Sequence, residues 1–453
     1  MKADILVAEI GSTTTVVNAF NIKDEISFLG SGQSPTTVYD GDVNIGLKNA
    51  VDDLCQKLGA DKIEYDELLA TSSAAGGLKM TVHGLVYDMT VRAAKEAALG
   101  AGANIHMITS GRLMRTDLEK IKTINPNIML LAGGVDYGER ETAVYNAELI
   151  AKLDLNVPVI YAGNVQNQDE IKLIFKDSKA KLYIVENVYP KIDQLNVEPT
   201  RKVIQDVFEE HITHAPGMSK VRDMVNGNII PTPAGVMEAT KVLAEVLGDV
   251  VTIDVGGATT DIHSVTEGSE EISRQLISPE PHAKRTVEGD LGVYVNAANV
   301  IEMAGRDNLK KELGVNDEKL DEIISLHQPI PKTDMDKKFT ESLTAVACKT
   351  AMQRHAGEFI ELFSTAGKRT IAQGKDLTAV KYVIGTGGAL TRLPKGYEII
   401  QDMLRMNSGL KLMPKETAKI LLDTDYIMAS LGVLSKKYRE GSIALLKKSL
   451  GIN

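Results

Sequence analysis

The sequence predicts an α/β protein of more than one domain, and three of its features support this prediction. A strand-like apolar run reaches an acid and then glycine at Ile5–Thr15 and again at Val250–Asp261. A third such run, Val383–Lys395, enters a double glycine. Between the first two runs, helical and strand-like segments alternate over residues 90–190. Alternation of this kind is typical of βαβ crossovers and therefore of a parallel sheet.

Composition limits the classes of protein to consider. The 453 residues suffice for two or more domains, and 43% apolar with 25% charged residues is typical of a globular protein. A net charge of −10 argues against a general nucleic-acid binder. Cys55 and Cys348 lack any CxxC partner, which favours a reducing compartment. No apolar run reaches bilayer length, and Asp4 and Glu9 interrupt the N-terminus. We therefore expect a cytoplasmic protein with no membrane or nucleic-acid partner.

The N-terminal part is predicted to open with three strands, at residues 5–9, 15–20 and 26–32. Gly11 lies at the first turn. Asn44 is predicted to cap the helix that follows, which Gly59 ends, and Leu68–Ser72 is predicted to be the next strand. Three antiparallel strands at the start of a domain are similar to the opening of a ribonuclease H-like fold. Residues 1–89 are therefore predicted to form a first half.

The alternating block is predicted to contain helices at residues 90–99, 112–123, 138–153 and 167–176, and strands at 105–109, 128–131, 157–161 and 182–185. It is large for an insertion, so residues 90–215 are predicted to form an inserted α/β domain. The Pro- and Gly-rich stretch Thr213–Pro233 is predicted to be its boundary. Within the block, Leu131–Asp136 is similar to Ile384–Leu390. A second ligand site there is one interpretation, and a plain Gly133-Gly134 turn is the favoured one.

Residues 234–453 are predicted to form the second half. A helical apolar stripe ends at Gly248, and after Asp261 the chain is predicted to return as a hairpin of strands at 262–266 and 273–277. Lys284 and Arg285 are expected to be an ordinary surface pair. A long, partly buried helix is predicted from about residue 343 to 362.

Val250–Asp261 indicates a particular chemistry. Glycine lets backbone N–H groups approach an anion closely, because no Cβ intervenes. Asp254 and Asp261 flank the glycines and cannot contact phosphate directly, so they fit a phosphate site only if a divalent cation lies between. A tight turn between strands, with polar side chains, is the alternative for this stretch alone.

All three glycine-containing runs, in this order, resemble the two phosphate motifs and the adenosine motif of the actin, hexokinase and heat-shock chaperone ATPase superfamily. The resemblance implies two ribonuclease H-like halves around a nucleotide cleft, with ATP or ADP and magnesium as ligands. The nucleotide-binding residues that it implies are Gly11, Ser12, Thr13, Gly256, Gly257, Ala258, Thr259, Gly387, Gly388, Ala389 and Arg392. Arg392 is expected to stack on the base.

The same resemblance implies a catalytic set of acids, Glu9, Asp254 and Asp261. Glu9 and Asp254 would hold a hydrated magnesium ion, and Asp261 would order the attacking water. The superfamily's usual residue at the first position is Asp. The extra methylene of Glu9 moves its carboxylate by roughly 1 Å, so we expect Asp254 to carry more of the metal binding.

Over nearly its full length, the chain resembles the MutL-type companion proteins of adenosylcobalamin-dependent amino-acid mutases. The resemblance is carried by Gly11–Thr13, Ser72–Leu78, Leu130–Asp136, Arg285–Gly292 and Gly385–Leu393. It implies a slow ATPase that acts as a reactivating chaperone and exchanges damaged cobalamin. The implied partner is an aminomutase of the glutamate mutase or ornithine aminomutase type.

Two other functions stay open on the sequence. A small-molecule kinase or an actin-like assembly protein would share the fold and the motifs, and a homo-oligomer is compatible with all three. No motif in the sequence indicates a sugar or acid substrate, which disfavours the kinase. HExxH, nucleophile-elbow and Walker-type GxxxxGK[ST] motifs are missing from the sequence, so zinc hydrolysis, serine hydrolysis and P-loop chemistry are not expected.

Overall fold

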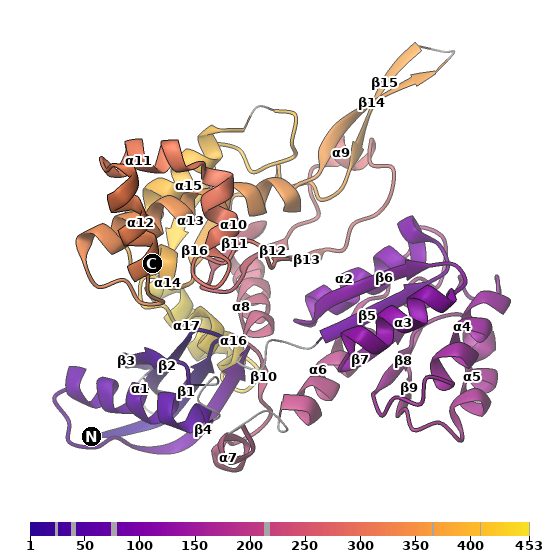
Figure 1. Ribbon diagram of the computed structural model, residues 1–453, viewed down its shortest axis with the longest axis horizontal. Helices are drawn as coiled ribbons and strands as arrows, with labels where there is room; N and C mark the ends of the chain where they lie inside the picture. Colours follow the sequence, from indigo (N-terminus) through magenta and orange to yellow (C-terminus); the bar gives the residue numbers. More distant parts are fainter. Residues whose placement is uncertain are drawn as a thin grey trace. The chain divides into compact units, whose positions relative to one another are not determined.

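The computed structural model describes residues 1–22, 26–37, 42–73, 79–212, 218–364, 367–407 and 409–452 (Figure 1). The chain divides into two compact units. Unit 1 contains Met1–Ala74, Pro216–Ile277 and His282–Asn453, and unit 2 contains Ala75–Ala215 with Ser278–Pro281. Unit 2 thus begins before residue 90, where the sequence places the boundary. Among the described helices, none is both long and apolar enough to span a bilayer.

The first half of unit 1 is a five-stranded sheet of order β10-β4-β1-β2-β3. Its strands are β1 (Lys2–Ile10), β2 (Thr14–Asn21), β3 (Ser27–Pro35), β4 (Glu64–Ser72) and β10 (Ile230–Pro231). β1, β2 and β3 are antiparallel neighbours, which confirms the predicted opening, and β1 runs parallel to β4. The helix α1 (Val43–Lys57) is capped by Asp42, whose side chain accepts from the Asn44 N–H at 2.9 Å. Asn44, the predicted cap, is therefore already inside the helix.

The second half of unit 1 repeats this topology. Its sheet has the order β13-β12-β11-β16-β17. The strands are β11 (Val250–Val255), β12 (Thr260–Val265), β13 (Ala283–Glu288), β16 (Tyr382–Thr386) and β17 (Lys419–Leu422). β11, β12 and β13 are antiparallel, and β11, β16 and β17 are parallel. Both sheets therefore have three antiparallel strands followed by two parallel ones, as two ribonuclease H-like halves require.

Two element predictions in this half are wrong. Residues 270–273 form the short helix α9 (Glu270–Ser273), because Ser269 caps it by accepting from the Ile272 N–H, and the returning strand is β13 instead. The buried helix α13 (Asp334–His355) ends before Gly357. Phe359 lies on β14 (Glu358–Ser364), which pairs with β15 (Gly367–Gln373) in a hairpin that extends from the rest of the unit in Figure 1. A Cβ at Gly357 would lie 2.5 Å from the Gln373 carbonyl oxygen, so glycine allows this hairpin to close.

The further helices of unit 1 are α7 (Met218–Met224), α8 (Thr232–Leu247), α10 (Ala297–Ala304), α11 (Arg306–Leu313), α12 (Asp317–Leu326), α14 (Gly388–Thr391), α15 (Gly396–Arg405), α16 (Met428–Leu434) and α17 (Arg439–Ser449). α8 and α16 pack against each other so closely that a Cβ at Gly432 would overlap the carbonyl oxygen of Gly235. They share one hydrophobic core with β1, β2, β11 and β16. This shared core joins the two halves.

Unit 2 is a parallel sheet of order β6-β5-β7-β8-β9. Its strands are β5 (Lys79–Gly84), β6 (Asn104–Ser110), β7 (Ile128–Leu131), β8 (Val159–Tyr161) and β9 (Leu182–Ile184). Its helices are η2 (Tyr87–Val91), α2 (Arg92–Gly100), α3 (Arg115–Ile124), α4 (Glu141–Ala151), η3 (Val165–Asn167), α5 (Gln168–Phe175) and α6 (Glu198–Ile212). The predicted alternation is confirmed. From β5 the chain first adds β6 on one side, and it then adds β7, β8 and β9 on the other side. This reversal makes it a doubly wound sheet with helices on both faces.

The close crossing of α8 and α16 gives a stability prediction. Gly432→Ala should lower the free energy of unfolding by about 2–3 kcal/mol, because the added methyl group meets backbone that cannot rotate away. Gly289→Ala is the matched control, since a Cβ at Gly289 has no neighbour within 4 Å. Chemical denaturation compares the two variants. Equal stability would contradict a tight crossing.

Candidate nucleotide site

Two hairpins of unit 1, β1–β2 and β11–β12, have the same local geometry. In the first, the Gly11 N–H donates to the Thr14 carbonyl at 3.0 Å, and in the second the Gly256 N–H donates to the Thr259 carbonyl at 2.9 Å. The pairs that close the loops are Ile10 with Thr15 and Val255 with Thr260. Glu9 and Asp254 therefore occupy equivalent positions, each one residue before the end of its strand.

The tips of the two hairpins lie against each other. A Cβ at Gly257 would lie 2.7 Å from the Thr13 hydroxyl oxygen, so only glycine permits this approach. Hydrogen bonds to Ser73 and from Thr36 hold the first loop in place. The Ser12 hydroxyl donates to the Ser73 carbonyl at 2.9 Å, and the Thr36 hydroxyl donates to the Gly11 carbonyl at 2.8 Å. The two predicted phosphate motifs thus meet, although more than 240 residues separate them in the chain.

The second loop is braced by the segment Val293–Asn296, which follows β13. It donates hydrogen bonds to all three carbonyls of Gly256–Ala258. The donors are the N–H of Val293 to Gly256 at 3.2 Å, the N–H groups of Tyr294 and Val295 to Gly257 at 2.9 and 2.8 Å, and the side-chain amide of Asn296 to Ala258 at 3.0 Å. The position of the second phosphate loop therefore depends on Val293–Asn296, a segment that the sequence analysis did not assign to the site.

Asp254 is half-buried at the end of β11. Within the described part of the chain, no group donates a hydrogen bond to its carboxylate. Burial and, to a lesser extent, the negative charges of Asp261 and Glu9 together raise the pKa of Asp254 to about 7, while Arg285 opposes them. This carboxylate is therefore placed to accept a cation or the water bound to one.

Glu9 is buried and partly engaged. Its Oε1 accepts hydrogen bonds from the Ser430 N–H at 2.9 Å, the Ser430 hydroxyl at 2.5 Å and the Asn18 amide at 3.3 Å. The pKa of Glu9 is raised to about 7, mainly by burial and also by the charge of Asp423, while the hydrogen bond from the Ser430 hydroxyl opposes the rise. No described residue donates to Oε2, so this second oxygen has no protein partner in competition with a ligand.

Asp261 is buried and forms an ion pair with Arg285, whose Nε and Nη2 donate to Oδ1 at 3.0 and 2.6 Å. The Thr259 hydroxyl donates to Oδ2 at 2.9 Å, so both carboxylate oxygens are engaged. The expectation that Lys284 and Arg285 are a surface pair is wrong, because both residues are buried and Arg285 is only 1% exposed. Arg285 pairs with His263 in the β12–β13 register, which places it diagonally across from Asp261 on one face of the sheet.

Asp423 is a fourth acid that the sequence analysis missed. It directly follows β17, and its carboxylate accepts from the Thr386 hydroxyl at 2.9 Å, the Ser449 hydroxyl at 2.6 Å and the Met428 N–H at 2.9 Å. Its charge raises the pKa of both Glu9 and Asp254. The sequence does contain a pattern that could have identified Asp423, because an acid after the apolar run Ile420–Leu422 repeats the arrangement seen at Glu9 and Asp254.

The comparisons with known proteins place these residues in a family. A model of the MutL protein family matches residues 5–450. The chain belongs to the MutL family. It is 37% identical over 460 residues to Protein MutL of Clostridium tetanomorphum, with 98% of each chain covered.

Solved structures that resemble this MutL-family chain are more distant. One is a diol dehydratase-reactivating factor in nucleotide-free form, with 10% identity, a TM-score of 0.38 and coverage of 96% of this chain and 99% of that chain. Another is a glycerol dehydratase reactivase, with 12% identity, a TM-score of 0.31 and coverage of 95% and 100%.

The third predicted motif lies beside the acids in this MutL-family protein. Gly387 has a φ of 85°, and a Cβ there would lie 2.6 Å from Oδ1 of Asp254. A Cβ at Gly388 has no neighbour within 4 Å, and Ala389 is buried in α14. The Arg392 guanidinium lies 5.6 Å from the centre of the Tyr426 ring, so an aromatic partner already covers one face of this predicted base-stacking group.

Other predicted features need no ligand to explain them. In unit 2, a Cβ at Gly163 would lie 2.5 Å from the Gly133 nitrogen, and the Gly134 carbonyl accepts from the Asn187 amide at 3.0 Å. Tight packing of the loops accounts for the glycine pair there. Ala74–Leu78, part of the MutL resemblance, lies outside the described residues. Among the residues described, no three His, Cys, Asp or Glu side chains converge to bind a metal directly.

The buried acids predict how stability depends on pH. Below about pH 4 both folded and unfolded chains hold the protons, and between about pH 4 and 7 only the folded chain keeps them. Ligand-free protein should therefore lose stability as pH rises through this window and then level off. Asp254→Asn should reduce that loss by an amount of order 2 kcal/mol. Urea unfolding from pH 5 to 8 measures it, with exposed Asp52→Asn as the control, and identical pH profiles for all three proteins would contradict the prediction.

The adjacent glycines of the third motif should behave differently. Gly387→Ala should lower the free energy of unfolding by about 2–4 kcal/mol, because it combines a positive φ with a collision against β11. Gly388→Ala should leave stability nearly unchanged and weaken nucleotide binding alone. Denaturation and nucleotide titration of both variants separate the two effects. Equal loss of stability in both would refute the assignment.

Proposed function

We propose that unit 1 binds Mg·ATP between its two hairpins and hydrolyses it slowly. The observation that carries this proposal is the Asp254 carboxylate, which has no hydrogen-bond donor among the described residues and is surrounded by other acids. A site with this excess of negative charge requires a cation. Magnesium keeps much of its water shell, so one or two carboxylates and the nucleotide phosphates suffice to hold it.

The proposed roles follow the geometry. Backbone N–H groups of Ser12, Thr13 and Gly257–Thr259 would bind the phosphates, whereas those of Gly11 and Gly256, which the sequence also predicted to do so, donate within their own loops. Gly387–Ala389 would lie along the nucleoside. Asp254 would hold water on the magnesium ion, and Glu9 would do so through its free Oε2. Asp261, which forms an ion pair with Arg285, would orient the attacking water. Magnesium would supply charge neutralisation at the phosphates.

A melting experiment tests nucleotide binding. Mg·ATP should raise the melting temperature, because a ligand that binds only the folded state stabilises it. Asp254→Asn should reduce ATP hydrolysis roughly 10- to 100-fold, and Glu9→Gln should reduce it less, since the Glu9 carboxylate is already anchored by Ser430. Asp52→Asn serves as the control. No shift at millimolar nucleotide, with or without magnesium, would rule out the ATPase.

We infer further that the ATPase serves a reactivating chaperone for an adenosylcobalamin-dependent enzyme, and that the client is an aminomutase of the glutamate mutase or ornithine aminomutase type. Membership of the MutL family supports this inference, together with the resemblance of the motifs to mutase companions. In this proposal, nucleotide-driven motion of the two halves releases damaged cobalamin from the client. Unit 2, a complete doubly wound sheet, would contact the client.

The alternative of a small-molecule kinase is distinguished by its product. A kinase needs a general base that accepts a proton from its substrate, and Asp261 is the acid of the second motif that would take this role. A kinase would form a phosphorylated small molecule and would need no protein client. The actin-like assembly protein is distinguished by experiment, since it needs no client.

The decisive assay follows an aminomutase inactivated with cobalamin that lacks its adenosyl group. With fresh adenosylcobalamin and Mg·ATP, the wild-type protein should restore activity, whereas Asp254→Asn, or wild type with a non-hydrolysable ATP analogue, should not. The client should also change nucleotide affinity, because coupling is reciprocal. Equal recovery in all three reactions would exclude a role for hydrolysis. No recovery in any would favour the kinase or the assembly protein.

A further inference from the structure

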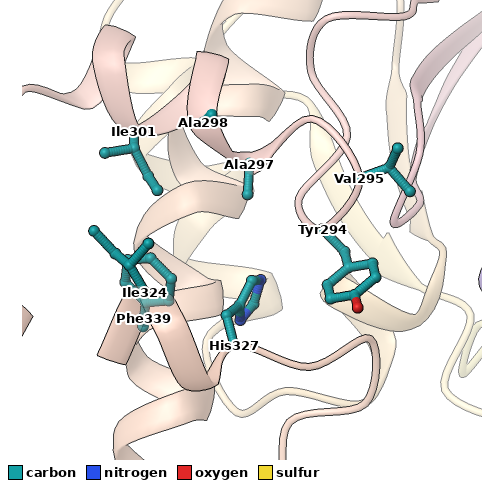
Figure 2. A pocket seen from close by; sticks show the side chains of 8 residues that line it. All are labelled: Tyr294, Val295, Ala297, Ala298, Ile301, Ile324, His327 and Phe339. Atoms are coloured by element: carbon teal, nitrogen blue, oxygen red, sulfur yellow. The ribbon is translucent and has the colours of Figure 1, made fainter. Parts of the chain in front are cut away.

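Unit 1 has a cavity directly behind the second phosphate loop. Its volume is about 440 Å³, within the range of small-molecule sites. Figure 2 shows Tyr294 and Val295 on one side, Ile324 and Phe339 on the other, and His327 between them. Ala297, Ala298 and Ile301 of α10 complete the lining. Tyr294 and Val295 are 36% and 50% exposed, so the cavity opens to solvent on their side.

The lining determines the kind of ligand. None of the eight lining side chains is an acid, a lysine or an arginine, so the cavity suits an uncharged group. Tyr294, His327 and Phe339 already interact as rings, with centroids 5.6 Å apart for the first pair and 5.1 Å for the second. Aromatic walls of this kind favour a further ring in an offset or edge-to-face position.

His327 joins the cavity to the phosphate loop. Its Nε2 lies 2.8 Å from the Val293 carbonyl oxygen, so this nitrogen carries the proton and donates it. Val293 and its neighbours in turn bind the carbonyls of Gly256–Ala258. A ring that displaces His327 or Tyr294 therefore moves the donors that fix the second phosphate loop.

We propose that this cavity is a second ligand site, which takes an uncharged ring or pair of fused rings, and that its occupation changes the affinity of the nucleotide site. The ligand class follows from the lining. The coupling follows from the segment Val293–Asn296, because its Tyr294 and Val295 line the cavity and the segment also binds the phosphate loop. This regulation goes beyond the proposed chaperone activity and does not depend on a client.

Indole tests the cavity. Because the chain has no tryptophan, indole fluorescence can be followed without protein background. Millimolar indole should raise the melting temperature of the wild-type protein but not of Ala298→Trp, in which the new side chain fills the cavity. Asn299→Trp, on the exposed neighbouring position of α10, is the matched control and should bind indole as wild type does. No shift in wild type, or an equal shift in Ala298→Trp, would overturn the site.

The same variants test the coupling. The single tryptophan of Ala298→Trp should emit at shorter wavelength than that of Asn299→Trp, and Mg·ADP should change only the former. In wild type, indole should change the Kd for Mg·ADP at least about twofold, with an equal reciprocal change in the Kd for indole. Val295→Trp replaces Ala298→Trp if that variant does not fold.

Two further outcomes would separate the ligand site from its coupling to the nucleotide site. Indole binding without any change in nucleotide affinity would overturn the coupling and leave the cavity as a ligand site. If no nucleotide binds to wild type, the coupling and the proposed ATPase both fail, and the indole measurement still decides the cavity.

Discussion

The central constraint in this protein is the repulsion among four carboxylates held close together by two sheets. Glu9, Asp254 and Asp423 each lie at or just beyond the end of a strand, and Asp261 pairs with Asp254 across the β11–β12 hairpin. The guanidinium of Arg285 forms an ion pair with Asp261. Burial raises the pKa values of Glu9 and Asp254, and repulsion from the neighbouring acids adds to the rise, so that both values are about 7 and both groups tend to hold protons. A bound cation would replace those protons, so metal binding and folding stability are linked at this site.

Close backbone contacts hold this arrangement together. The lack of a Cβ leaves room for Thr13 at Gly257, for the end of β11 at Gly387, and for the backbone of Gly235 at Gly432. The first two contacts are within the candidate site, and the third joins the helices that connect the halves. A side chain at any of the three positions would separate elements whose spacing fixes the acids. Stability and site geometry therefore depend on the same contacts.

The second phosphate loop is held by Val293–Asn296, whose Tyr294 and Val295 also line the apolar cavity beside His327. The first loop is braced by Ser73 and Thr36, from its own sheet and the segment after β3. The two hairpins thus have the same local geometry but different supports. This difference in supports is the basis of the coupling that we propose between the cavity and the nucleotide site.

Local patterns in the sequence predicted the strands of the two phosphate hairpins, their glycine turns, and Glu9 and Asp254 near the strand ends. These depend on neighbouring residues, since apolar alternation, turn glycines and strand-end acids are local patterns. The sequence also predicted the alternation of unit 2 and the family. Tertiary structure decided which groups meet. Glu9 contacts Ser430 and Thr13 contacts Gly257, across separations that no local pattern reports. Arg285, expected at the surface, is buried because the β12–β13 register places it beside Asp261. Register and packing fix such contacts, and they depend on the whole fold.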